Sequence, residues 1–188
     1  MGKTLPQIDD DLKAWIEKQK MFFVATAPLS PEGHVNLSPK GGDSLRVLGP
    51  LTVAYHDFTG SGVETISHLR ENGRIVIMLC AFEGGPRIVR LHGRGEFLLP
   101  DHPDFGKLLP LFPPNIGSRS IIRIQVDRIS SSCGFQVPLY EFKADRTVLD
   151  EYARKRGAEG LYEYRCENNV TSIDGLPGLS GLADKART

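Results

Sequence analysis

Short segments of alternating apolar and polar residues follow one another along most of the chain, and turns that contain glycine or proline join them. This alternation is typical of β-strands, because successive side chains of a strand point to opposite faces. At most one short helix lies between any two of these strands, whereas parallel strands need a long, usually helical, crossover. The sequence therefore predicts a mainly β fold, an antiparallel barrel, and its helix count excludes a doubly wound parallel sheet.

Six strands are expected. They cover residues 22–27, 34–40, 44–56 with a bend at Gly49-Pro50, 75–82, 87–99 and 122–127. The fourth of them is continuously apolar, which predicts a central strand covered on both faces.

Helical spacing of apolar residues predicts helices at both ends of the chain and a short helix after the third strand. The expected helices run from Ile8 to Ile16, from Ser61 to Asn72, near Phe105 to Leu109, and from Asp145 to Gly157. The second of these begins with a capping-box pattern, Ser61 and Glu64, and Gly73 supplies a left-handed stop. The first is expected to pack across the barrel as a lid.

The length of 188 residues suits one domain, which we expect to span residues 1–188 with a core at about 20–135 and a C-terminal helix and irregular tail at 140–188. Basic and acidic residues number 23 each, so no overall charge draws the chain to nucleic acid or to a membrane surface. We find no apolar run long enough to span a bilayer and no apolar signal core, so a cytoplasmic location is expected. The three isolated cysteines are expected to be reduced, packed thiols.

The turn from His56 to Gly62 joins a strand to a helix and is rich in small residues. Amide groups at a helix N-terminus lack internal partners, so such a turn is suited to binding phosphate. The alternative is that Ser61 and Glu64 cap the helix and satisfy these amides themselves. Both interpretations are compatible with the local sequence.

Two other strands carry a polar face. In residues 34–40, Asn36, Ser38 and Lys40 alternate with Val35 and Leu37, so a hydroxyl and a cation lie on one side of the strand. This polar face favours the phosphate-binding interpretation of the neighbouring turn.

The strand at residues 87–99 places Arg90 and His92 on one face, and Arg90 is the better candidate for contact with an anionic or heteroaromatic ligand. For His92, a solvated outer face is the stronger interpretation. His34, His56 and His92 lack the local spacing of metal ligands, so no metal site is expected.

Five segments of the chain are similar to members of the pyridoxamine 5′-phosphate oxidase-like family of flavin mononucleotide (FMN)-binding split barrels, and closest to its small members rather than to the vitamin B6 oxidases. They are HVNLSPKGGD from His34, AYHDFTGSGVETISHLRENGR from Ala54, RIVRLHGRGEF from Arg87, SCGFQVP around Cys133 and NNVTSIDGLPGL from Asn168. The resemblance implies an antiparallel split β-barrel and a homodimer that binds FMN in a groove between its subunits.

The resemblance also implies roles for particular residues. Residues 35–40 match the strand that passes under the flavin, and His56 and Asp57 match the end of the next strand. Glu64 and Thr65 stand where the B6 oxidases have a basic pair for the FMN phosphate, so a carboxylate replaces one cation. Ile88 replaces a flavin-contacting glutamine, and the C-terminal Trp and Arg-x-His signature of the B6 oxidases is absent. The family resemblance therefore does not extend to the vitamin substrate.

The function expected from these observations is that of an FMN-dependent oxidoreductase with a nicotinamide or other small-molecule electron donor. Its expected cofactor-binding residues are Asn36, Ser38, Lys40, His56, Asp57, Thr65 and Arg90. No residue is identified as a catalytic acid or base. The alternatives are a non-catalytic protein that binds or sequesters flavin, a stress protein with little turnover, and a protein that holds a deazaflavin or haem.

Overall fold

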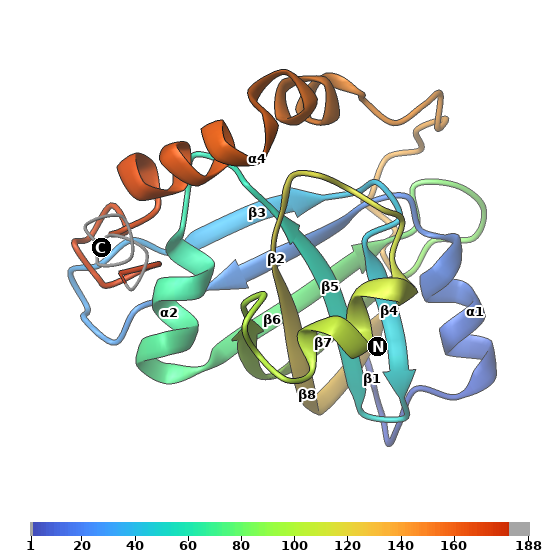
Figure 1. Cartoon of the computed structure of the whole chain (residues 1–188). Helices are drawn as coiled ribbons and strands as arrows, with labels where there is room; N and C mark the ends of the chain where they lie inside the picture. Colours follow the sequence, from blue (N-terminus) through green and yellow to red (C-terminus); the bar gives the residue numbers. More distant parts are fainter. Residues whose placement is uncertain (1, 181–188) are drawn as a thin grey trace.

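The computed structural model describes residues 2–180, and within this range the chain forms one eight-stranded antiparallel sheet with helices around it (Figure 1). The strands are β1 (Lys3–Leu5), β2 (Phe22–Thr26), β3 (Asn36–Lys40), β4 (Leu45–Gly49), β5 (Thr52–Phe58), β6 (Arg74–Cys80), β7 (Ile88–Leu98) and β8 (Ser118–Ser132). The helices are α1 (Asp10–Lys18), α2 (Glu64–Asn72), α3 (Phe105–Leu108), the 3-10 turn η1 (Leu109–Leu111) and α4 (Val148–Asn168).

The sheet runs in the order β3-β2-β6-β7-β8-β5-β4, and β1 pairs with β8 beside this path. The long strand β8 pairs with β7 along one edge, while its other edge pairs first with β5 and then with β1. Because β3 and β4 end the path without pairing to each other, the barrel is open. This arrangement confirms the predicted antiparallel split barrel.

The bend expected at Gly49-Pro50 is the turn of a hairpin, so the expected third strand is two strands, β4 and β5, with an irregularity in register between Val47 and Gly49. One strand was not predicted. The N-terminal residues Lys3–Leu5 form β1 against Ile129–Ser131. A three-residue strand is too short to show alternation, and its pairing partner lies at the other end of the fold, so no local pattern indicates it.

The main core lies between the curved sheet and the helices α1 and α2, which flank it on different sides in Figure 1. Leu12 and Ile16 of α1 and Ile66 of α2 are buried against sheet residues such as Ile77 and Leu91. The N-terminal helix is therefore part of the core. Each fully buried side chain of this size contributes about 1.5–3 kcal/mol to folding, so α1 and α2 hold the sheet in its curved form.

Helix α2 differs from its predicted start. It begins at Glu64 after Val63, and no side chain caps it, so the predicted capping box is wrong. The Glu64 carboxylate instead accepts a hydrogen bond from the amide of Ile173 at 3.4 Å, because a distant part of the chain competes for it. The predicted stop is confirmed, since Gly73 ends the helix with φ at 69°.

Helix α4 also differs from the prediction. It starts at Val148 and runs to Asn168, and Gly157, the expected end, interrupts it with φ at 67°. The helix resumes after this break and lies across the top of the molecule in Figure 1. Residues 169–180 then return beside α2, where Arg70 donates to the carbonyl of Gly178 at 2.8 Å. Residues 181–188 of the expected tail lie outside the described residues.

Two further expectations concern the cysteines and the membrane. Cys80 is buried and Cys166 is half-buried, but Cys133 is exposed, so the expected packing of its thiol is wrong. Of the helices in residues 2–180, none combines the length and apolar character that a membrane crossing requires.

Candidate functional site

The end of β5 carries a buried ion pair. The Asp57 side chain is 2% exposed and receives hydrogen bonds from Arg119, Nε to Oδ2 at 2.8 Å and Nη2 to Oδ1 at 3.2 Å. The Ser120 hydroxyl donates to the same carboxylate at 3.0 Å. Burial alone would raise the pKa of Asp57, but the charges of Arg119 and Lys40 and these hydrogen bonds lower it to about 2. Asp57 is therefore a carboxylate at neutral pH.

Lys40 is the second cation beside Asp57. Its Nζ lies 3.5 Å from Oδ1 of Asp57 and 5.9 Å from the centroid of the Tyr55 ring, and its side chain is one-quarter exposed. Because Arg119 already neutralises Asp57 through two hydrogen bonds, the three side chains together carry one net positive charge. That charge lies on Lys40, the exposed member of the group.

His56, the residue before Asp57 on β5, has an unpaired ring nitrogen. The ring is buried between Phe58 and Phe112, and its Nε2 lies 2.7 Å from the Ser118 hydroxyl. Among residues 2–180, no group pairs with its Nδ1. Burial lowers the pKa of His56, which favours the neutral ring at neutral pH. A neutral imidazole has one donor and one acceptor nitrogen, so Nδ1 retains unused hydrogen-bonding capacity within the described residues.

The polar face of β3 points inward and forms a hydrogen-bonded network. Asn36 donates through Nδ2 to the hydroxyls of Thr65, at 3.0 Å, and Thr26, at 3.1 Å. It also accepts a hydrogen bond from Ser38 at 3.1 Å, and the Thr26 hydroxyl lies 2.9 Å from Nδ1 of His68. The structure therefore brings the predicted residues Asn36, Ser38 and Thr65 together, and their hydrogen bonds run to one another.

Arg90 is separate from the other predicted residues. It lies on β7, and its guanidinium group is 3.4 Å from the Ser132 hydroxyl on β8. Arg90 is not among the residues that line the cavity described below.

The turn after His56 is held by three side chains that the sequence analysis did not single out. Arg119 donates to the carbonyl of Gly62 at 2.8 Å, and Asn169 donates to the carbonyl of Gly60 at 3.0 Å. Arg165 donates to the Thr59 hydroxyl at 3.3 Å. These contacts anchor two carbonyl oxygens and one hydroxyl of the turn. Phosphate binding by its amides stays a prediction.

These three residues had little signal in the sequence. Arg119 comes just before the predicted strand. If the strand is extended to it, Arg119 points to the same face as the apolar Ile121, and this pattern indicates a buried cation. Arg165 and Asn169 come after Gly157, where the helix was predicted to end. Because α4 in fact continues to Asn168, the sequence analysis did not place these two residues at the turn.

A cavity of about 1630 Å³ opens beside Lys40 and His56. It lies between the end of α1, the β3–β4 connection, the loop at residues 82–87 and the segment at residues 140–150. Of the predicted site residues, Lys40 and His56 line this cavity, whereas Asn36, Ser38, Asp57 and Thr65 do not. Among the described residues, no group of three or more potential ligands is placed to hold a metal ion.

The cavity is positively charged although the chain as a whole is neutral. Seven basic side chains line it against four acidic ones. The basic residues are Lys3, Lys18, Lys20, Lys40, Arg87, Lys143 and Arg146, and the acidic ones are Glu83, Glu141, Asp145 and Asp150. Two of the acids are already engaged, since Glu83 accepts from the amide of Phe142 at 2.7 Å and Asp150 from Asn115 at 2.8 Å. Anionic ligands are therefore favoured.

An open antiparallel sheet of this topology, with a ligand-sized cavity at its side, defines a split-barrel protein. The sequence profile of the pyridoxamine 5′-phosphate oxidase family matches residues 8–133. A pyridoxamine 5′-phosphate oxidase family protein of Aspergillus flavus, UstO, is 38% identical over 198 residues, which cover 95% of this chain and 78% of the relative. The chain belongs to the pyridoxamine 5′-phosphate oxidase family.

Solved structures agree with this fold at lower sequence identity. HupZ of Group A Streptococcus is 23% identical, with a TM-score of 0.50, and the match covers 65% of this chain and 91% of HupZ. A putative 5-nitroimidazole antibiotic resistance protein of Bacteroides thetaiotaomicron is 15% identical, with a TM-score of 0.50 over 70% of this chain and 86% of that protein. At these identities the likeness shows the fold alone.

Proposed function

We propose that the protein is a flavoprotein that binds FMN in the cavity beside Lys40 and His56 and uses it as an oxidoreductase. The observation that carries the proposal is the cavity wall itself. The wall contains a surplus positive charge, on Lys40, and His56, whose buried ring nitrogen Nδ1 has no partner among residues 2–180. Membership in the pyridoxamine 5′-phosphate oxidase family supports a flavin as the ligand.

The donor set fits such a cofactor. FMN carries an anionic phosphate, a hydroxylated ribityl chain and a planar ring with hydrogen-bonding edges. In the proposal Lys40 binds the phosphate, because Asp57 is already neutralised by Arg119. His56 Nδ1 hydrogen-bonds to the ribityl chain or the ring. The bound flavin would supply the hydride chemistry, while the protein orients it.

Asn36, Ser38, Thr65 and Asp57 have a positioning role in this proposal. Their contacts connect β3 to α2 and to the end of β5, so they fix the place of Lys40. Arg90 does not line the cavity. Its predicted contact with the flavin therefore requires a site shared with a second copy of the chain.

A homodimer is part of the proposal. On the outer face of β3, an end strand of the sheet, Leu37 is 63% exposed, and Val35, just before the strand, is 72% exposed. Apolar side chains on a strand without a second neighbour are suited to a subunit interface. Analytical ultracentrifugation should give twice the mass of the chain, and Leu37→Glu should shift the protein toward the monomer.

The first experiment identifies the ligand and the role of Lys40. The purified protein is denatured, the released chromophore is identified by absorbance and mass, and the apoprotein is then titrated with FMN and with riboflavin. We expect FMN to bind more tightly, and Lys40→Met to weaken FMN about tenfold while leaving riboflavin nearly unchanged. Lys155→Met, an exposed lysine away from the cavity, is the matched control.

A colourless protein without affinity for FMN would overturn the proposal. If flavin binds, stopped-flow reduction by NADH or NADPH tests the enzymatic part. Rapid reduction with many turnovers on an acceptor supports an oxidoreductase. Slow, stoichiometric reduction would show a flavin carrier instead.

A further inference from the structure

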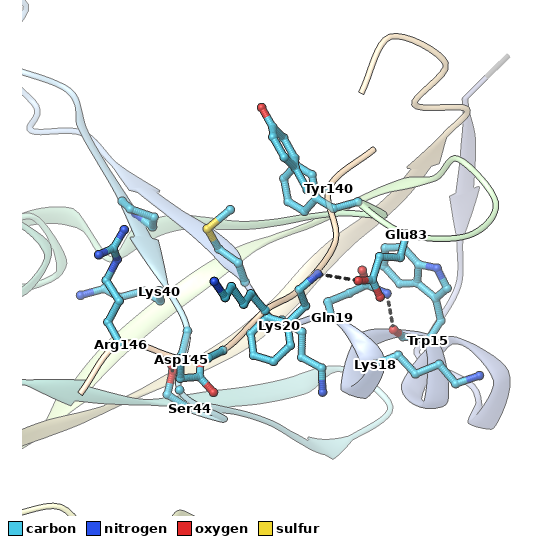
Figure 2. A pocket seen from close by; sticks show the side chains of 18 of the residues that line it. Trp15, Lys18, Gln19, Lys20, Lys40, Ser44, Glu83, Tyr140, Asp145 and Arg146 are labelled. Carbon is cyan, nitrogen blue, oxygen red and sulfur yellow. Dashed lines mark hydrogen bonds between the residues drawn. The ribbon is translucent and has the colours of Figure 1, made fainter. Parts of the chain in front are cut away.

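The two ends of the cavity carry separate groups of cations. Figure 2 shows Lys40 and Arg146 on one side of the cavity and Trp15, Lys18 and Glu83 on the other. Arg87 belongs to the second side, because its guanidinium carbon lies 5.0 Å from the centroid of the Trp15 ring. Only the first side is used by the proposed FMN site.

Arg87 is held in a fixed orientation at its end of the cavity. Its Nε donates to the Ser131 hydroxyl at 3.1 Å, and its backbone carbonyl accepts from the amide of Ala81 at 2.8 Å. Within the described part of the chain, Ser131 is the one hydrogen-bond partner of the guanidinium group, and it is bonded to Nε. The two terminal nitrogens, Nη1 and Nη2, therefore lack an acceptor there. A guanidinium group with two free parallel donors binds a carboxylate in a bidentate manner.

The charge at this end favours an anion. Lys3 lies next to Ser131 in the sheet, since the two residues are paired across β1 and β8, and Lys18 lies near Trp15. These three cations line the cavity with two carboxylates, Glu83, which accepts a hydrogen bond from the amide of Phe142, and Glu141, which follows Tyr140. The remaining positive charge is available to a ligand.

Aromatic rings form the rest of this wall. The Phe82 and Tyr140 rings pack with their centroids 5.6 Å apart, and the amide of Tyr140 donates to the carbonyl of Phe82 at 2.9 Å. With Trp15, these rings line the cavity and offer stacking surfaces to a planar group. The cavity, at about 1630 Å³, is also larger than the roughly 300–1,000 Å³ that a single small ligand occupies.

We propose that the Trp15–Arg87 end of the cavity is a second ligand site, which binds an aromatic carboxylate while the Lys40 end holds the flavin. Arg87 pairs with the carboxylate, and the rings of Trp15, Phe82 and Tyr140 contact the planar part. The assignment of the Lys40 end rests on the proposed function, whereas the aromatic-carboxylate site stands on its own contacts.

The chain offers a direct reporter, since Trp15 is its one tryptophan. Flavin-free protein is titrated with benzoate and with the uncharged benzamide, and binding is followed by calorimetry and by Trp15 fluorescence. We expect benzoate to bind at least tenfold more tightly than benzamide. Arg87→Gln should remove this preference, and Arg87→Lys should reduce it, because lysine keeps the charge but not the bidentate fork.

Arg128→Gln, on an exposed arginine of β8 outside the cavity, is the matched control and should bind benzoate as the wild type does. Equal binding of benzoate and benzamide, or an unchanged preference in the Arg87 variants, would overturn the site. The titration is repeated with FMN-saturated protein, where loss of benzoate binding would show one shared site and overturn simultaneous occupancy. If FMN does not bind at all, the proposed function fails while the benzoate titration of the flavin-free protein still decides this proposal.

Discussion

Two arginines at opposite ends of β8 differ in what surrounds their charge: Arg119 is at its start, and Arg87 contacts Ser131 near its end. Arg119 is buried, and its guanidinium group donates to Asp57, to the carbonyl of Gly62 and to Asn169. Arg87 faces the cavity, and its guanidinium group donates to one hydroxyl. A buried charge is tolerated when protein groups neutralise it, while a charge left without a partner on a cavity wall is available to a ligand. Arg119 therefore stabilises the fold, whereas Arg87 is the arginine that contacts the ligand in the proposed second site.

The largest expected effect comes from removing Arg119. Arg119→Met leaves the Asp57 carboxylate buried with only Lys40 and Ser120 beside it, so we expect a loss of about 3–5 kcal/mol in the free energy of unfolding. Urea denaturation measures this. Arg128→Met, an exposed arginine on the same strand, should change stability by less than about 0.5 kcal/mol. A loss below 1 kcal/mol for Arg119→Met would show that the ion pair is not structural.

The acid sensitivity of the fold should follow from the same pair. The pKa of Asp57 is lowered from 3.8 to about 2 in the folded protein, so the folded state favours the carboxylate. This stabilisation, about 2 kcal/mol, is complete above the unfolded pKa and is lost as the pH falls from about 5 toward 2. Denaturation at a series of pH values should show the decline, and Asp57→Asn should flatten it. An equal slope in the variant would assign the decline to other carboxylates.

Asn169 connects the buried Arg119 to the C-terminal segment. Its amide is buried, donates to the carbonyl of Gly60 and accepts from Arg119 at 3.0 Å. Asn169→Ala removes these partners, and we expect a loss of about 1–2 kcal/mol in the free energy of unfolding. Asn168→Ala, at the exposed neighbouring position, serves as the control. An equal effect of both variants would indicate a general loss of helix stability.

The smallest expected loss of stability comes from removing Arg87. Arg87→Met should cost less than about 1 kcal/mol of stability, because it removes one hydrogen bond to Ser131 and a cation–π contact with Trp15. A large loss of stability would place Arg87 with Arg119 among the structural arginines. The same urea titration, read in parallel with Arg119→Met, decides between them.

Much of the fold follows from local patterns in the sequence. Alternation predicted β7, a continuous apolar run predicted β6, and Gly73 marked the end of α2, because these patterns are properties of neighbouring residues. Local patterns failed where a distant segment competes. Glu64 bonds to Ile173 instead of capping its own helix, and Lys3–Leu5 becomes a strand only because β8 lies beside it.

Local patterns also indicated some residues of the candidate site, while contacts between distant segments were not indicated. The polar face of β3 indicated that Asn36, Ser38 and Lys40 lie together, and the structure places them so. The sequence did not indicate that Arg119 would neutralise Asp57, which is what leaves the charge on Lys40. Nor did it indicate the Trp15–Arg87 contact, because α1 and the loop that ends at Arg87 approach each other only in the folded chain.

The two edges of β8 have a consequence for how the chain folds. This strand pairs with β7 on one edge and with both β5 and β1 on the other, so it joins the beginning, the middle and the end of the sheet. During synthesis β1 emerges first, yet it has no partner until residue 131 has been made. Pairing between such distant segments raises the contact order, and high contact order slows folding. The N-terminal strand should therefore be among the last elements to become protected from hydrogen exchange.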